Sequence, residues 1–129
     1  MKSIRDRACS LACTVLVAAP AFASALEECL PSGEGAAVLR CLASEEVKVN
    51  GELASSEASA ARRAREVEQA TGRLGAHAVL AKSVHDFAQY RVSQCTYVRE
   101  MLASSSRATP AQAGCRVDLT RRRLRELTP

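Results

Sequence analysis

The stretch that decides the fold is FAQYRVSQC, residues 87–95, followed twenty positions later by Cys115. Residues four apart lie on one face of a helix, so Phe87, Arg91 and Cys95 fall on the same side. Cys115 opens the next helical segment and can reach Cys95 if the two helices pack side by side. Together with the export signal described next, the stretch predicts two neighbouring helices joined by a disulfide in an oxidising compartment.

The first 23 residues have the three parts of a secretory signal peptide. A positive segment precedes the apolar residues 8–19, and a small-x-small cleavage site ends at Ala23, with cleavage after Ala25 as the alternative. The apolar run is shorter than the ~20 residues needed to span a bilayer. We therefore expect a periplasmic or secreted protein with no stable membrane anchor after cleavage, whose domain is residues 24–129.

The composition of residues 24–129 limits the functions that the chain can have. They carry 15 basic and 13 acidic side chains, a net charge of +2, which is too small to indicate nucleic-acid binding. Their number suits one domain. Because the aromatic residues are only Phe87, Tyr90 and Tyr97, the core must consist mostly of Ala, Val and Leu. Small exported domains with such cores are often stabilised by disulfides.

Two of the six cysteines lie in the signal peptide, and four remain: Cys29, Cys41, Cys95 and Cys115. Four cysteines allow three pairings. We favour Cys29 with Cys41 and Cys95 with Cys115, because each pair closes a short local loop. A zinc site is the alternative, but no C-x-x-C or His–Cys cluster has ligand spacing. We expect neither a metal nor another cofactor.

Hydrophobic periodicity predicts three principal helices, at about residues 34–70, about 76–103, and from Thr109 towards the C-terminus. Thr109 followed by Pro110 fits a helix start, with the threonine as cap. The expected apolar faces are Leu42, Val49, Leu53, Ala60 and Val67 on the first helix, Leu80, Val84, Phe87, Val98 and Leu102 on the second, and Cys115, Leu119, Leu124 and Leu127 on the last. The prediction is an all-α fold, a small antiparallel bundle of about three principal helices held by two disulfides.

Arg91 is the charge of greatest interest, because it lies on or beside the apolar face of the second helix. An unpaired buried ion costs several kcal/mol, so Arg91 must find a partner or reach solvent. We expect Glu46 on the first helix to pair with it, and Asn50, one turn later, to add a hydrogen bond. The resulting cluster is predicted to be an inter-helix clamp, with a ligand site as the alternative.

No catalytic constellation is visible in the sequence. It contains no paired acids, nucleophile elbow or glycine-rich phosphate loop. His77 and His85 are eight residues apart and do not share a helical face, so they form a poor metal pair. Nothing in the sequence indicates an enzyme.

The chain resembles the exported lysozyme-inhibitor-like domain family, named for the LprI lipoprotein. That family has two early cysteines, then D-x-x-L-N, then W-x-x-Y-R-D-x-x-C, and a final cysteine before L-T-x-x-R-x-x-x-L. The matching residues are Cys29, Cys41, 46–50 (EVKVN), 87–95 with Tyr90 and Arg91, Cys115, Leu119, Thr120, Arg123 and Leu127. Four positions differ: Glu46 replaces Asp, Val49 replaces Leu, Phe87 replaces Trp, and Val92 replaces the Asp after Arg. The chain is therefore similar to a divergent member.

This resemblance implies a periplasmic helical binding protein, with inhibition of lysozyme as the associated activity. If the protein inhibits lysozyme, we expect the loop at residues 104–108 to be the wedge that enters the enzyme. Ser105 and Arg107 are the candidate contact residues of this loop, and Arg107 is placed to meet the carboxylates of the cleft.

The alternative is a structural or adaptor protein of the cell envelope, which binds a protein partner or an anionic glycan or lipid. Its contact surface would be the arginine-rich final helix, with Arg121 and Arg122 as candidates. On a helix, however, residues 121–125 fan around the axis, and cations are favourable at a helix C-terminus without any ligand. Binding to anionic surfaces weakens steeply with ionic strength, whereas a wedged inhibitor loses much less.

Overall fold

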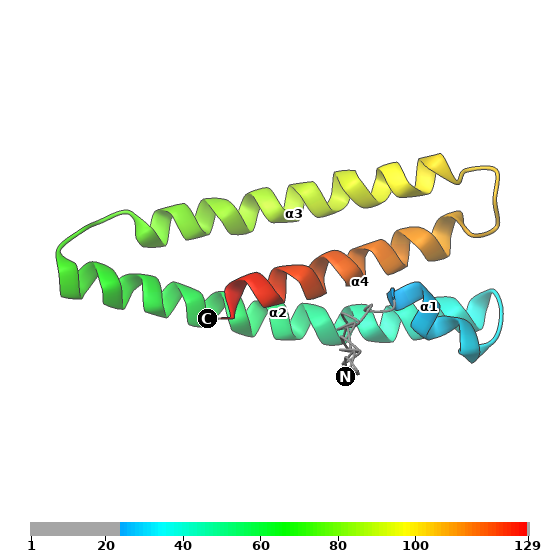
Figure 1. Ribbon diagram of the computed structural model, residues 1–129, viewed down its shortest axis with the longest axis horizontal. Coiled ribbons are helices and arrows are strands. Elements are labelled where there is room, and N and C mark those ends of the chain that lie inside the picture. The colour runs from blue at the N-terminus through cyan, green and yellow to red at the C-terminus, as the bar shows by residue number, and fades with distance from the viewer. Residues whose placement is uncertain (1–23, 129) are drawn as a thin grey trace, which may run out of the picture.

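The computed structural model describes residues 24–128, which form helices and no strands. The elements are α1 (Ala25–Cys29), a 3-10 turn η1 (Leu30–Ser32), α2 (Ala36–Thr71), α3 (Ala76–Met101) and α4 (Ala108–Leu127). The long helices α2, α3 and α4 run up, down and up along one axis (Figure 1). The predicted all-α bundle of three principal helices is confirmed. The predicted signal peptide lies outside the described residues.

The helix boundaries agree with the sequence prediction to within two residues for α2 and α3. The start of α4 was predicted wrongly, because Arg107 and not Thr109 occupies the N-cap position. Pro110 lies in the first turn of α4. A proline is tolerated there because the first N–H groups of a helix have no acceptor within the helix.

The short helix α1 was not predicted, and it is held by both local and long-range hydrogen bonds. The Ser24 hydroxyl accepts from the Glu27 N–H at 3.3 Å, and the Glu27 carboxylate accepts from the Ser24 N–H at 3.0 Å. Ala25 is fully buried, and its N–H donates to Oδ1 of Asp118 on α4 at 2.9 Å. Burial raises the pKa of Asp118, and this hydrogen bond acts against the rise. The first residues of the domain are therefore part of the fold.

Close approach of α1 to α4 depends on Gly114. A Cβ atom at this position would lie 3.1 Å from Cβ of Leu26, closer than most real contacts. A side chain at position 114 would therefore require Leu26 to move by a few tenths of an ångström.

The hydrophobic core lies between α1, α2 and α4. Its buried members are Ala25, Cys29, Val38, Leu42, Val49, Ala113 and Val117. Of the face predicted for the first helix, all members are buried except Val67, which is 54% exposed. That part of the prediction was wrong because α4 ends before it reaches Val67. From α3, only Cys95 is fully buried.

Both predicted disulfides are confirmed. Cys29–Cys41 joins α1 to α2, and Cys95–Cys115 joins α3 to α4, with Cα–Cα distances of 5.7 and 5.6 Å. Both bridges lie near the end of the bundle that carries the α1–α2 and α3–α4 connections, which we call the disulfide end.

Within residues 24–128, no helix is both long enough and apolar enough to cross a membrane.

Removal of the Cys95–Cys115 bridge should lower the free energy of unfolding substantially. The bridge spans 20 residues, and a loop of that length gives about 3 kcal/mol through the unfolded state. Urea unfolding of the protein carrying Cys95→Ala and Cys115→Ala measures the loss. The Cys29–Cys41 bridge spans only 12 residues, so its removal by Cys29→Ala and Cys41→Ala should cost less stability. A smaller loss on removal of Cys95–Cys115 than on removal of Cys29–Cys41 would contradict this prediction.

A chain that begins at Leu26 should be less stable than one that begins at Ser24. It lacks the Ser24 cap and the Ala25 N–H bond to Asp118, which together should contribute about 1–2 kcal/mol. Urea unfolding of the two oxidised chains measures the difference. Equal stability would show that α1 needs neither bond.

Candidate functional site

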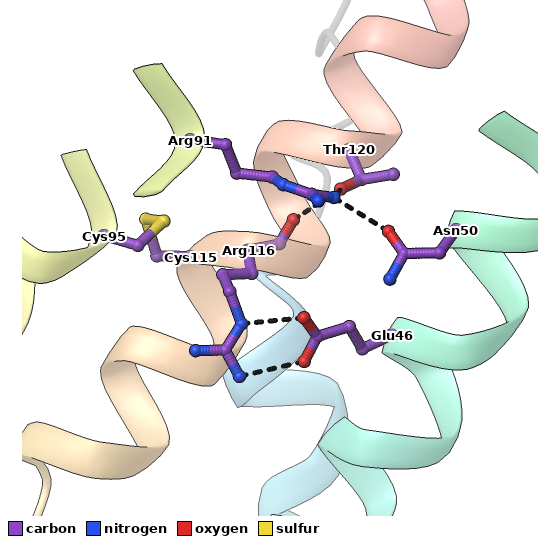
Figure 2. A network of polar contacts seen from close by, with 7 residues as sticks. All are labelled: Glu46, Asn50, Arg91, Cys95, Cys115, Arg116 and Thr120. Carbon is purple, nitrogen blue, oxygen red and sulfur yellow. Dashed lines mark hydrogen bonds and ion pairs between the residues drawn. A yellow bond between two sulfur atoms is a disulfide. The ribbon is translucent and has the colours of Figure 1, made fainter. Parts of the chain in front are cut away.

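The residues of the predicted clamp, Glu46, Asn50 and Arg91, lie in the middle of the bundle, where α2, α3 and α4 face one another (Figure 2). The central group is the guanidinium of Arg91. Its Nη1 donates to Oδ1 of Asn50 on α2 and to Oγ1 of Thr120 on α4, both at 2.8 Å. The Thr120 hydroxyl donates in turn to the carbonyl of Arg116 at 2.8 Å. One side chain of α3 thereby joins both other helices.

Glu46 does not pair with Arg91, so that prediction was wrong. Its carboxylate accepts two hydrogen bonds from Arg116 on α4, from Nε at 2.7 Å and from Nη2 at 2.9 Å. These bonds raise the pKa of Arg116. Glu46 and Asn50 are one turn apart on α2, and Arg116 and Thr120 are one turn apart on α4. Glu46 and Arg116 therefore pair directly, and one turn further along both helices Asn50 and Thr120 are joined through Arg91. The bond between Arg91 and Asn50 was predicted.

Phe87 packs between two cations. The guanidinium carbon of Arg91 lies 5.8 Å from the ring centroid, and that of Arg123 on α4 lies 5.6 Å from it. Arg123 also donates to the Ser83 hydroxyl at 2.8 Å. The contact with Arg91 stays within α3, whereas the contact with Arg123 holds the aromatic position of the family pattern against α4.

The basic run of α4 does not form one open patch. Arg121 is half-buried and forms ion pairs with Glu28 at 2.8 Å and with Glu45 at 3.1 Å, which tie α4 to α1 and α2. Arg122 is exposed. Of the two candidate contacts on this helix, only Arg122 is presented to solvent.

Glu57 on α2 belongs to the same polar region and was not predicted. Burial raises the pKa of its carboxyl, while the charges of Arg123 and Arg91 act against the rise. Its Oε1 and the Nε of Arg123 are buried without a hydrogen-bond partner among the described residues. This half-buried acid and the two arginines therefore influence one another electrostatically.

The exchange of Asp for Val after Arg91 leaves this network unaffected. Val92 is 63% exposed, so a carboxylate at that position would face solvent, away from the contacts of Arg91. Tyr90 is 49% exposed.

No sequence pattern pointed to Arg116, and the prediction therefore missed it. Thr120 and Arg123 were marked only by the family pattern.

The chemistry of this cluster is that of a clamp. Its groups are guanidiniums, an amide, a hydroxyl and carboxylates that face cations. Among residues 24–128, no three His, Cys, Asp or Glu side chains come together to hold a metal ion.

The predicted wedge loop lies at the disulfide end, away from the clamp. Arg107 is exposed, and its N–H donates to the Ser105 hydroxyl at 3.1 Å. Ser105 is half-buried, and its carbonyl accepts from the Ala108 N–H at 3.1 Å. Ser105 therefore shapes the loop, and Arg107 is the side chain that it presents.

Arg107 also borders a groove of about 450 Å³ between this loop and the α1–α2 connection. The groove is lined by Leu26, Leu30, Gly33, Glu34, Gly35, Val38, Ser106, Arg107 and Pro110. Leu30 is 49% exposed at its edge. The disulfide end thus combines a cation with an accessible apolar surface.

Comparison with known proteins gives one match. The family model described as "Lysozyme inhibitor LprI" matches residues 27–127. No curated protein and no solved structure matches the chain.

Replacement of Thr120 by Val should destabilise the bundle, because Thr120 is fully buried and accepts from Arg91. The substitution preserves shape but leaves a half-buried cation with one acceptor fewer, at a cost of about 1–3 kcal/mol. Urea unfolding measures the loss. Thr128→Val is the matched control, since Thr128 is exposed at the end of α4 and should change stability by less than about 0.5 kcal/mol. Equal effects of the two substitutions would contradict the clamp.

Proposed function

We propose that this protein, which belongs to the lysozyme inhibitor LprI family, is an exported binding protein that inhibits lysozyme. The observation that carries the proposal is the family match, which extends over nearly all of the described residues. Inhibition of this kind needs a surface that fits the enzyme and no catalytic group of its own.

The disulfide end supports this role because its loops are fixed before a partner arrives. Cys29–Cys41 lies beside the α1–α2 connection, and Cys95–Cys115 holds the helices that flank the 102–107 turn. Within that turn, the Ser105 N–H donates to the Leu102 carbonyl at 2.8 Å. A contact surface that is already ordered loses less conformational entropy on binding.

Arg107 is the side chain best suited to enter the enzyme. Lysozyme cleaves its glycan with two carboxyl groups that flank the scissile bond. An exposed guanidinium matches a carboxylate in both charge and geometry. The apolar groove beside Arg107 gives the rest of the loop a surface that is buried on contact.

The same argument disfavours the arginine-rich helix α4 as the contact surface. Arg121 is bound to Glu28 and Glu45, and Arg123 to Ser83, so these cations already have partners within the bundle. An adaptor that binds through this helix has Arg122 available at the surface, but it would reach Arg121 and Arg123 only by breaking those contacts.

Lysis assays with animal, goose-type and invertebrate-type lysozymes test the proposal. The oxidised protein should protect cells from at least one of these enzymes near stoichiometric concentration. Arg107→Ala should weaken inhibition by about tenfold or more, the effect of losing a central charged anchor. Moderate salt should change inhibition little.

Arg73→Ala is the matched control, because Arg73 is an exposed arginine in the α2–α3 connection, at the opposite end of the bundle. It should inhibit as well as the wild type. Protection from none of the three enzymes would refute the function, whereas undiminished inhibition by Arg107→Ala would refute only the proposed wedge.

A further inference from the structure

Helix α4 is shorter than α2 and α3, the two long helices it packs against. It ends at Leu127, whose carbonyl accepts from Nη2 of Arg63 at 3.0 Å, while α2 continues to Thr71. Beyond this contact, α2 and the start of α3 form a two-helix hairpin that projects past α4 (Figure 1). We call residues 61–79 the hairpin tip.

The hairpin tip exposes apolar side chains on the faces that α4 covers elsewhere. Val67 lies one turn after Arg63, which contacts the end of α4. Val79 lies one turn before Ser83, which accepts from Arg123 of α4. Residues four apart share a helical face, so both valines continue these faces beyond the end of α4. They are 54% and 70% exposed.

The turn of the hairpin presents Leu74, the most exposed large apolar residue of the described chain at 88%. The turn is held by hydrogen bonds. The Glu68 carboxylate accepts from the N–H groups of Gly75 and His77, both at 2.9 Å, and these bonds lower its pKa. Gly72 ends α2 with a left-handed φ of 67°. Leu74 therefore projects from an ordered backbone, which loses little entropy on contact.

The net positive charge of residues 24–129 is concentrated at the same place. The hairpin tip contains four arginines and two glutamates, a net charge of +2, and the remaining residues contain eleven basic and eleven acidic side chains. All four of these arginines are exposed: Arg62, Arg63, Arg65 and Arg73.

We propose that the hairpin tip docks on the surface of an anionic lipid bilayer, with Leu74 and the two valines entering the interfacial layer and the arginines facing the headgroups. Shallow burial of apolar side chains beside basic ones is the means by which proteins bind such surfaces. Tip-to-tip association of two copies is disfavoured because both tips are positive. A soluble polyanion would gain nothing from Leu74.

Sedimentation with lipid vesicles tests this surface. The exported, oxidised protein should pellet with vesicles that contain phosphatidylglycerol and remain free with pure phosphatidylcholine, and added salt should release it. Leu74→Ser should lower the partition coefficient by about tenfold, the effect of losing one buried leucine. Arg73→Gln should lower it by about fivefold. Leu74 and Arg73 are both exposed in the turn, so neither change disturbs the core.

Leu30→Ser and Arg107→Gln are the matched controls at the disulfide end, and both should bind vesicles like the wild type. Three outcomes would overturn the proposal: no binding to the anionic vesicles, undiminished binding by Leu74→Ser, or self-association in solution that Leu74→Ser abolishes. A soluble polyanion such as dextran sulfate distinguishes a glycan from a bilayer. If it retains the wild type and Leu74→Ser equally, and neither protein binds vesicles, the partner is a glycan and not a membrane. Arg107 is tested in the lysozyme assay and is a control in the vesicle assay, and Arg73 has the reverse roles. Failure of one proposal therefore leaves the other untouched.

Discussion

The arrangement of the three long helices depends on the need to satisfy one guanidinium inside the bundle. Arg91 bonds to Asn50 on α2 and Thr120 on α4, and Thr120 is fully buried. A rotation or slide of α2 or α4 would remove one of the two acceptors of this partly buried guanidinium, and a shift of α3 would break both bonds. Because α3 buries only Cys95 completely, apolar packing alone gives it little definition. Polar contacts therefore fix the register of α3, and the Cys95–Cys115 bridge secures it.

The bundle has two ends with different physical character. At the disulfide end, α1 covers the core and both bridges lie nearby. At the other end α4 is absent, and the hairpin tip consists of two helices and their connection. A third helix is what allows apolar residues of the other two to be buried. Its absence explains why Val67 is exposed although it continues the same stripe as Ala60.

This division suits a protein with two kinds of contact. The ordered loops beside the bridges form a surface suited to a rigid partner, with Arg107 at its centre. The hairpin tip is basic and apolar, which suits a bilayer surface. The clamp between the two ends takes part in neither contact; it keeps them at a fixed separation.

The sequence by itself determined the three long helices and favoured the correct cysteine pairs. Hydrophobic periodicity and the spacing of cysteines are local properties, so both can be read directly from the sequence. Tertiary structure decided which charges meet. Glu46 pairs with Arg116 and not with Arg91, because the axial register of α2 against α4 decides which side chains meet. No local sequence pattern contains that register. Likewise, the place of α1 against the bundle depends on Asp118 and Gly114 of α4, about ninety residues away in the sequence. The exposure of Val67 follows from where α4 stops, which is a relation between helices that the sequence of α2 does not contain.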